Sequence, residues 1–531
     1  MAFRQALRFM STSRPALHDS AVIGLFSNGQ LAGLPRSAAA TAKTALEEEL
    51  ARVGLKGKSG EAKIVYGNFG LGAEIKKVAL VGLGQQGATN AAKDRVRMAV
   101  AAGVKALKAE KATAIGVSTM SGHDQAAAEG ATLALYSFNQ FKSGKKKTEN
   151  GDQIAITLLE EQQEAAAFEK GLISAKAQNL ARTLMETPAN HMTPTLFAER
   201  FQKEIEALGL GADQVEVLVR DQAWAESHKM GAFLSVARGS DEPLRFIEFR
   251  YYGAKDKNER PLALVGKGVT FDTGGISLKP SANMGAMKGD MGGAATVAAA
   301  LWGIAALQLP INVVAGIPLT ENMPSGRATK PGDVVTSMSG KTIEVDNTDA
   351  EGRLILADAL TYISKTYQPH TLVDLATLTG AMDVALGAAY AGVFSTDDQL
   401  WQELDTAGQT AHEWFWRMPL NSVYLGQITA NTCADLVNTG GRSAGSCTAA
   451  IFLREFVHGA IRDDGVQERE GEESTEVGQS LDKIEHEVRY AHIDIAGVMD
   501  TTKSNGYYAK GMTGRPARAL IEFAKQFANK Q

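Results

Sequence analysis

A long stretch without charged residues, Met291 to Thr320, sets the strongest limit on how this chain can fold. A stretch of that length could cross a bilayer as one helix. It is rich in alanine and glycine, however, and it contains Pro310 and polar amide side chains. A buried helix over about 293–307, followed by a buried strand over about 311–317, accounts for it better, because strands of parallel sheets are apolar on both faces. We therefore expect no transmembrane segment and a large α/β core.

Strand-like apolar runs recur along the chain and alternate with helical patterns, which is typical of α/β proteins. Such runs lie at 22–26, 77–81, 261–265, 311–317, 342–345, 371–375 and 492–495. We predict a smaller N-terminal α/β domain and a larger C-terminal domain with a mostly parallel central sheet flanked by helices. The predicted boundaries are an N-terminal extension over 1–20, the first domain over 21–165, a connecting helix over 166–189 and the second domain over 190–531.

Composition and charge exclude several classes of protein. The chain has 531 residues, of which 44% are hydrophobic and 22% charged, as in a globular protein that buries a large core. The net charge of −5 gives no basic footprint for nucleic acid. Ten acidic residues against two basic ones fall within 463–487, which we interpret as a solvated insertion rather than a docking loop. The only two cysteines, Cys433 and Cys447, fit a reducing, intracellular compartment.

The first 18 residues carry Arg4, Arg8 and Arg14, no acidic residue, and serine or threonine at positions 11–13. This resembles a mitochondrial transit peptide, and a frayed N-terminal tail is an equally good interpretation. We therefore expect an intracellular protein of the cytoplasm, and residues 1–18 keep the mitochondrial matrix open as a location.

Two short motifs point to chemistry that the rest of the sequence does not support. Gly82–Gly87 spells a dinucleotide fingerprint, but the acidic residue expected about 20 positions later is missing from 103–107. Gly441–Gly445 spells the nucleophile elbow of serine hydrolases, a fold in which an acid and then a histidine follow the serine. Only His458, His486 and His492 follow here, and two of them lie in or beside the acidic insertion. We interpret the first as a strand-to-helix turn and the second as a glycine-rich loop before a helix. A nucleotide-binding enzyme remains the weaker alternative.

The first group of chemically competent residues follows the apolar run 261–265. Lys267 and Asp272 are expected at the carboxyl edge of a buried strand, where open α/β sheets bind their ligands. Lys279 follows seven residues after Asp272, and Asp290 directly precedes the alanine-rich helix.

The second group is the acidic run Asn347 to Arg353, between the strand 342–345 and a helix that starts near Leu354. Asp349 and Glu351 are two residues apart, and in extended backbone that spacing directs both carboxylates to the same side.

Taken together, these groups place four acids and two lysines at strand ends inside otherwise apolar sequence. Buried like charges need neutralising, and two divalent cations would match the four carboxylates. A ligand set rich in oxygen and without histidine suits magnesium, manganese or zinc.

The run Asn347 to Leu354 resembles the signature of the leucyl aminopeptidase (cytosol aminopeptidase) family of two-metal metallopeptidases. Residues 265–296 resemble that family's first metal-ligand segment. Further matches lie at 179–194, 372–381, 447–457, 491–499 and 512–523. The resemblance covers about 190–531 and, more weakly, the N-terminal domain. The acidic insertion 463–487 departs from the family pattern.

The resemblance implies two divalent metal ions per subunit, zinc or manganese, with magnesium and cobalt as alternatives. One would be held by Lys267, Asp272, Asp290 and Glu351, and the other by Asp272, Asp349 and Glu351. Lys267 can ligate only as a neutral amine, which two adjacent cations favour by lowering its pKa.

The same resemblance implies a catalytic pair, Lys279 and Arg353, with a bicarbonate bound near Arg353 as general base. The residues that resemble the lining of the substrate side-chain pocket are Met287, Thr377, Leu378, Gly380, Ala496 and Met499. Ordinary core packing is an equally good interpretation of this last group.

The function implied is metal-dependent removal of the N-terminal residue from peptides with a free N-terminus, with a preference for leucine-like first residues. The resemblance also implies a homohexamer. The alternative is a non-catalytic or moonlighting homologue that acts in assembly or binds DNA. The complete set of candidate residues argues against inactivity, and the absence of a basic stripe argues against nucleic acid as a partner.

Overall fold

The computed structural model describes residues 18–34, 40–72, 74–144, 154–159, 165–461, 486–504 and 506–529. Most of the N-terminal extension, residues 1–17, and most of the predicted acidic insertion, residues 462–485, lie outside the described residues. The chain divides into two compact units. Unit 1 comprises Met1–Thr183 and Asp500–Thr513, and unit 2 comprises Leu184–Met499 and Gly514–Gln531. The predicted range 190–531 thus includes a segment that the structure assigns to unit 1.

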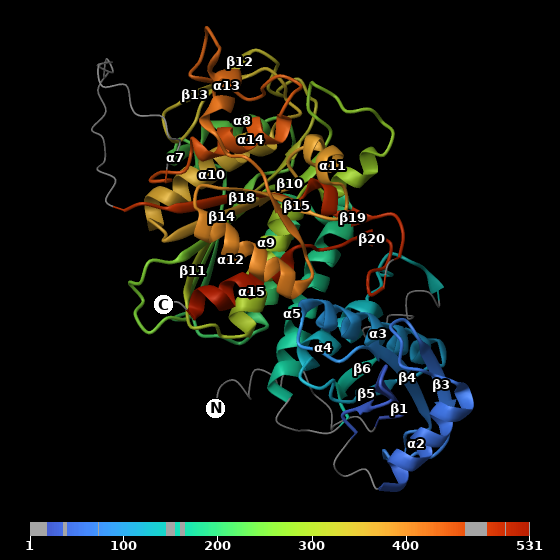
Figure 1. Cartoon of the computed structure of the whole chain (residues 1–531). Helices are drawn as coiled ribbons and strands as arrows, with labels where there is room; N and C mark the ends of the chain where they lie inside the picture. The colour runs from blue at the N-terminus through green and yellow to red at the C-terminus, as the bar shows by residue number, and fades with distance from the viewer. Residues whose placement is uncertain are drawn as a thin grey trace. The chain divides into compact units, whose positions relative to one another are not determined.

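Unit 1 is an α/β unit built on a sheet of order β3-β4-β1-β5-β6, with β2 paired to β1 (Figure 1). Its elements are β1 (Ser20–Phe26), β2 (Leu31–Ala32), α2 (Ala40–Val53), β3 (Ala62–Tyr66), β4 (Lys77–Gly84), α3 (Asn90–Ala109), β5 (Ala114–Val117), α4 (Asp124–Leu135), β6 (Ala155–Leu158), β19 (Asp500–Thr501) and β20 (Gly511–Met512). Helix α5 (Ala165–Glu186) runs from unit 1 into the start of unit 2.

Unit 2 holds the second and larger sheet (Figure 1). Its strands are β7 (Val215–Arg220), β8 (Arg245–Tyr252), β9 (Leu262–Gly266), β10 (Gly268–Asp272), β11 (Asn312–Asn322), β12 (Asp333–Thr336), β13 (Thr342–Val345), β14 (Thr371–Ala376), β15 (Ala391–Ser395), β16 (Phe415–Arg417), β17 (Leu436–Val437) and β18 (Arg489–Asp494). Its helices are α6 (Pro194–Glu206), α7 (Gln222–Ser227), α8 (Gly231–Ala237), α9 (Gly292–Ala306), α10 (Gly352–Tyr367), α11 (Gly380–Leu386), α12 (Asp398–Ala411), α13 (Gly426–Thr429), α14 (Gly445–Arg454) and α15 (Ala517–Ala528), with 3₁₀ turns that include η4 (Met284–Gly289) and η6 (Ala496–Val498).

The larger sheet has the order β16-β15-β18-β14-β9-β11-β8-β7, and β10 pairs with the end of β11. Its centre is parallel, because β18, β14, β9 and β11 all run in one direction. The antiparallel strands β8 and β7 extend one side, and β15 joins antiparallel on the other. The predicted α/β class with a mostly parallel sheet is therefore confirmed. The parallel strands β18, β14, β9, β11 and β10 direct their carboxyl ends to the same edge of the sheet.

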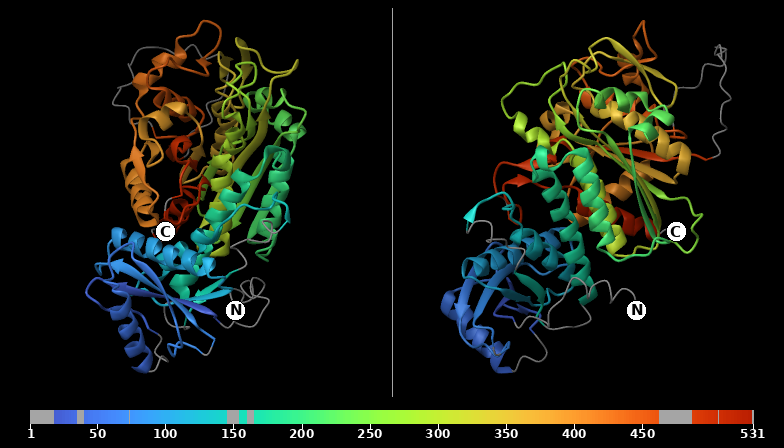
Figure 2. Two further views of the ribbon diagram at one scale, coloured as in Figure 1. Left: turned by 90° about the vertical axis from the view of Figure 1, so that its right-hand side faces the viewer. Right: turned by 180° about the vertical axis from the view of Figure 1, so that it is seen from behind.

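Helices cover both faces of this sheet (Figure 2). Along β9, Ala263 and Val265 belong to the same buried cluster as Leu360 of α10. Alternate residues point to opposite faces of a strand, so Gly266 points to the other face. There a Cβ on Gly266 would lie only 2.7 Å from the carbonyl oxygen of Gly293 in α9. The absence of a side chain lets the charge-free helix α9 lie directly against the end of β9.

The strand expected at 261–265 forms as β9. A second strand that was not predicted, β10, follows it after Lys267, which lies between two glycines. The peptide N–H of Lys267 turns to the carbonyl oxygen of Leu375 in β14, while β10 pairs with β11 alone. The strand 342–345 forms as predicted, but it lies in a separate small sheet of order β12-β13-β17 rather than in the main sheet.

Several other predictions are confirmed. The charge-free stretch forms helix α9 and strand β11, and β11 continues to Asn322, beyond the predicted end. The fingerprint at 82–87 is the turn between β4 and α3, and the glycine-rich loop 441–445 leads into α14. Every helix in the described part of the chain is too short or too polar to cross a membrane.

Candidate active site

The candidate residues of the first group converge at the carboxyl edge of the main sheet. Lys267 directly follows β9, and Asp272 ends β10. Asp290 lies between η4 and the start of α9. All three residues are buried, with exposed fractions of 5% or less. The strand is interrupted at Lys267, between β9 and β10, so the short segment 267–272 carries both a lysine and an aspartate at this edge of the sheet.

The second group is presented by a turn rather than by extended backbone. The peptide N–H of Ala350 donates to the carbonyl oxygen of Asn347 at 3.1 Å, which closes a turn around Thr348 and Asp349. Glu351 has helical dihedrals and is the N-cap residue directly before α10. The prediction that Asp349 and Glu351 share one side of an extended strand is therefore wrong. Their carboxylates approach the same cluster, but each meets a different lysine.

Two lysines pair with the four acids. The Nζ of Lys267 lies 2.7 Å from Oδ2 of Asp290 and 3.0 Å from Oε1 of Glu351. The Nζ of Lys279 lies 2.8 Å from Oδ2 of Asp272 and 2.5 Å from Oδ1 of Asp349. Each lysine thus joins an acid of the first segment to an acid of the turn 347–351. Helix α10 can approach this closely because a Cβ on Gly352 would lie 2.5 Å from Cε of Lys267.

The acids lie close enough together to bind a cation. One carboxylate oxygen each from Asp272, Asp290 and Glu351 lies within 4.8 Å of the other two, and all three residues are buried. Asp349 lies just outside this trio, on the more exposed side, where its side chain is 32% exposed. Four carboxylates are faced by only two ammonium groups here, so the residues present fit divalent cations with oxygen ligands.

The electrostatics of the cluster agree with this deficit of positive charge. Burial raises the pKa of Glu351 to about 8, with a further contribution from Asp272. Burial likewise raises the pKa of Asp290 to about 6, although Lys267 opposes it. Burial alone would lower the pKa of Lys267, but Asp290, Glu351 and Asp272 outweigh it and raise that pKa. The raised pKa of Glu351 therefore favours its protonated form at neutral pH when no cation is bound.

Arg353 also lies close to the cluster, in the first turn of α10, and is 7% exposed. Its Nε and Nη1 atoms are buried, and within the described residues neither has a hydrogen-bond acceptor. Burial lowers the pKa of Arg353 to about 10, so the guanidinium stays charged at neutral pH. A buried guanidinium with free donors fits an anion, since unpaired buried charge is costly.

The predicted pocket residues lie around the end of β14 and the turn η6. The hydroxyl of Thr377 donates to Oδ1 of Asp290 at 2.8 Å, which places this residue beside the acidic cluster. Asp494, at the end of β18, accepts the peptide N–H groups of Leu378 at 3.2 Å and Ala496 at 3.1 Å. Asp494 thereby ties together the two segments that carry most of the predicted pocket.

The other predicted pocket residues flank these segments. Gly380 starts α11, and Met499 directly follows η6. Met287 lies on η4 and is joined to the cluster through its carbonyl oxygen, which accepts the peptide N–H of Asp290 at 3.2 Å.

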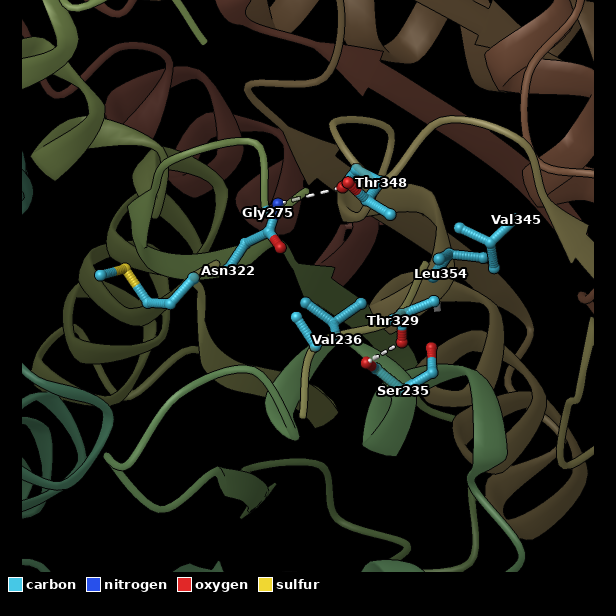
Figure 3. A pocket seen from close by; sticks show the side chains of 10 residues that line it. Ser235, Val236, Gly275, Asn322, Thr329, Val345, Thr348 and Leu354 are labelled. Carbon is cyan, nitrogen blue, oxygen red and sulfur yellow. Dashed lines mark hydrogen bonds between the residues drawn. The ribbon is translucent and has the colours of Figure 1, made fainter. Parts of the chain in front are cut away.

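Sequence reasoning missed Asn322, the last residue of β11. Its side-chain amide donates to Oδ1 of Asp272 and to the carbonyl oxygen of Thr348 at 2.8 and 3.0 Å. Figure 3 shows this amide nitrogen turned toward Thr348, with Gly275 beside it. The one available signal was a polar residue at the carboxyl end of a strand that neighbours the ligand-bearing strands.

Comparison with known sequences covers both units. Residues 179–521 match the catalytic domain of the cytosol aminopeptidase family, and residues 22–145 match its N-terminal domain. The chain is 43% identical to a cytosol aminopeptidase of Dictyostelium discoideum, over 95% of this chain and 92% of that protein. It is 46% identical to a cytosol aminopeptidase of Homo sapiens, over 89% of this chain and 84% of that protein.

Solved structures are also similar to this chain over most of its length. The bottromycin maturation enzyme BotP in complex with Mn superposes with a TM-score of 0.77 at 32% identity, over 96% of this chain and 99% of that chain. A mutant of tomato leucine aminopeptidase superposes with a TM-score of 0.75 at 29% identity, over 96% and 94% of the two chains.

Proposed function

The chain belongs to the cytosol aminopeptidase family of metal-dependent exopeptidases, and from that premise we propose how its own residues act. We propose that it removes the N-terminal residue from peptides, with a preference for leucine-like apolar first residues. The observation that carries this proposal is the buried cluster at the sheet edge, where four carboxylates face two lysines.

The proposed metal ligands are Lys267, Asp272, Asp290, Asp349 and Glu351, with zinc or manganese as the leading metals and magnesium or cobalt as alternatives. Asp272 and Glu351, each paired with a different lysine, would be the ligands shared by the two cations. When bound, two divalent cations polarise a carbonyl group and lower the pKa of water between them. Lys267 can bind a cation only as a neutral amine, so its ammonium group must lose a proton when cations bind.

Exposure indicates the side from which a peptide enters. The Lys267 side chain is 4% exposed, whereas those of Lys279 and Asp349 are 22% and 32% exposed. We propose that Lys279, at this open side, donates a hydrogen bond to the scissile carbonyl oxygen and stabilises the negative charge that develops there.

Arg353 has the complementary task of holding an anion with the donors that lack partners in the described residues. The anion that we propose is bicarbonate, which supplies a general base. Arg353 keeps it in place because its guanidinium is rigid and stays charged at neutral pH.

The proposed substrate pocket is lined by Met287, Thr377, Leu378, Gly380, Ala496 and Met499. Thr377 contributes through Asp290, to which its hydroxyl is bonded, while two methionines give the pocket an adaptable apolar lining. This composition supports leucine-like and methionine-like first residues.

Assembly and location belong to the same proposal. We propose a homohexamer in the cytoplasm, supported by the likeness to curated cytosol aminopeptidases. Mitochondrial import stays a prediction for residues 1–18, of which only His18 is described. Sedimentation of the purified protein would test the hexamer, and a mass near that of one chain would contradict it.

The test of the activity is a pair of substrates that differ only at the amine. Metal-reconstituted protein is expected to hydrolyse leucyl-amide and to leave N-acetyl-leucyl-amide intact, because an exopeptidase of this kind requires a free N-terminus. A panel of first residues then ranks leucine and methionine above aspartate and lysine. Equal hydrolysis of both amides would contradict the proposal, and so would an absence of hydrolysis with every metal.

A further inference from the structure

Asn322 occupies a position that the metal-ligand set does not explain. It ends β11 and is the register partner of Asp272 across the β10–β11 pair. Its carbonyl oxygen accepts both the peptide N–H and the hydroxyl of Thr273, at 3.0 and 2.8 Å. The residue is 5% exposed, and the two hydrogen bonds from Thr273 fix its backbone at the sheet edge.

The amide of Asn322 faces both carboxylates proposed to bridge the cations. Its Nδ2 lies 2.8 Å from Oδ1 of Asp272 and 3.4 Å from Oε2 of Glu351. The other oxygen of each carboxylate faces a lysine, since Oδ2 of Asp272 lies 2.8 Å from Lys279 and Oε1 of Glu351 lies 3.0 Å from Lys267. The amide of Asn322 thus contacts one oxygen of each acid, and a lysine faces the other oxygen of each.

The same amide also fixes the turn that carries the second ligand group. Nδ2 donates to the carbonyl oxygen of Thr348 at 3.0 Å, and the Thr348 hydroxyl donates to the carbonyl oxygen of Gly274 at 2.6 Å. A Cβ on Gly275 would come within 2.9 Å of Oδ1 of Asn322, so the glycine leaves room for the amide (Figure 3). A single side chain therefore connects both ligand-bearing loops.

The chemistry requires an amide at this position. Three acceptors converge on Nδ2, and only the nitrogen end of the side chain can donate to them. An aspartate would fill the same space with a third carboxylate against Asp272 and Glu351. Groups that hydrogen-bond to metal ligands orient them, and their loss typically weakens metal binding about 10- to 100-fold.

We propose that Asn322 is a positioning residue that orients Asp272 and Glu351 for cation binding. This inference rests on the proposed function, because it assumes that the acidic cluster binds divalent cations. Asn322 is not proposed to touch the substrate or the cations.

Asn312, at the opposite end of the same strand, is the matched control. It is also buried, at 3% exposed, and its Nδ2 donates to the carbonyl oxygens of Asp256 and Glu259 at 2.8 and 3.1 Å. Its Oδ1 also accepts the peptide N–H of Ala254 at 3.4 Å. Asn312→Ala therefore removes the same atoms and three hydrogen bonds from β11, without touching the acidic cluster.

The test is a calorimetric titration of the metal-free full chain with Mn²⁺. Asn322→Ala is expected to weaken Mn²⁺ binding roughly 10- to 100-fold, and Asn312→Ala to leave it unchanged. With saturating Co²⁺, the visible absorption spectrum of Asn322→Ala should differ from that of the wild type, and that of Asn312→Ala should coincide with it. A general loss of stability would not produce this contrast.

Wild-type affinity in Asn322→Ala, or an equal loss in Asn312→Ala, would overturn the inference and leave the proposed function standing. If Asn322→Ala does not fold, Asn322→Ser replaces it, and a folded serine variant with wild-type affinity would overturn the inference equally. Failure of the wild type to bind Mn²⁺ or any other divalent cation would instead overturn the proposed function.

Discussion

Two buried groups of charged residues in unit 2 differ in what balances their carboxylates. Glu248, fully buried on β8, accepts from Arg220 at 2.8 Å and also from Arg250 and the hydroxyl of Tyr367. Burial alone would raise the pKa of Glu248, but hydrogen bonds from Tyr367, Arg250 and Arg220 lower it. The protein itself supplies the positive charge for this carboxylate.

The acidic cluster at the carboxyl edge of the same sheet is balanced only in part. Burial raises the pKa of Glu351 to about 8, despite two lysines nearby. The partners of Glu248 lower its pKa, so the fold itself satisfies this carboxylate. The raised pKa of Glu351 occurs together with three further carboxylates and only two lysines, which is the combination that fits an external cation. The contrast between Glu248 and Glu351 therefore separates a structural ion pair from a candidate ligand.

The largest expected difference in activity is between two variants, each of which removes one buried carboxylate charge, from the acidic cluster or from the Glu248 group. Glu351→Gln should lower kcat/KM by about 10³-fold or more and reduce bound metal, because it removes a proposed bridging ligand. Glu248→Gln should keep the wild-type metal content and most of the activity. Steady-state kinetics with leucyl-amide and metal analysis of both variants measure this difference, and equal losses in the two variants would erase the distinction.

The two groups also differ in their arginines. Arg250 donates to the carboxylates of Glu216 and Glu248, whereas Nε and Nη1 of Arg353 have no hydrogen-bond acceptor among the described residues. Arg353→Met should lower kcat about 10²-fold, the contribution of a positioned general base, and keep the metal content. Added bicarbonate should stimulate the wild type and not the variant. Stimulation of Arg353→Met by bicarbonate would place the anion elsewhere.

The pH dependence of metal binding gives a smaller effect of fixed sign. The raised pKa values of Glu351, about 8, and of Lys267 mean that cations must displace protons from both groups at neutral pH. Asp290, with a pKa of about 6, adds a further proton only at lower pH. Mn²⁺ affinity should therefore fall as the pH falls, by about tenfold per unit for each displaced proton. Titrations between pH 6 and 9 measure the slope, and an affinity independent of pH would contradict this assignment.

The smallest effect is on the stability of the metal-free protein, where the two groups should act with opposite signs. The pKa of Glu351 is higher in the folded protein, about 8, than the ordinary value of 4.5 for glutamate. The metal-free protein should therefore lose stability as the pH rises from about 4.5 to about 8, because the folded state resists ionisation of this group. Glu351→Gln should therefore increase the free energy of unfolding at pH 9, by about 1 kcal/mol, and Glu248→Gln should decrease it by about 1–2 kcal/mol. Denaturant unfolding at pH 6 and 9 measures both, and equal signs at pH 9 would contradict the comparison.

Much of the architecture was predictable from local pattern. The charge-free stretch gave a buried helix and strand, and the strand ends placed Lys267 and Asp272 at one edge, because parallel strands end together. Their convergence with Glu351 also followed from the need to balance buried acids.

The remaining details depend on pairings between distant strands, which no local pattern contains. The strand is interrupted at Lys267, between β9 and β10, because the peptide N–H of Lys267 donates to β14 whereas β10 pairs with β11. The turn around Asp349 and the amide of Asn322 become visible only once the two loops lie together. The roles assigned to the individual site residues stay predictions.

The central claim is that the acidic cluster binds two divalent cations, and anomalous diffraction from Mn²⁺-soaked crystals tests it most directly. The account predicts two anomalous peaks per chain among Lys267, Asp272, Asp290, Asp349 and Glu351, both lost in crystals of Asp272→Ala. An absence of peaks there, with manganese bound only at exposed carboxylates, would contradict the account.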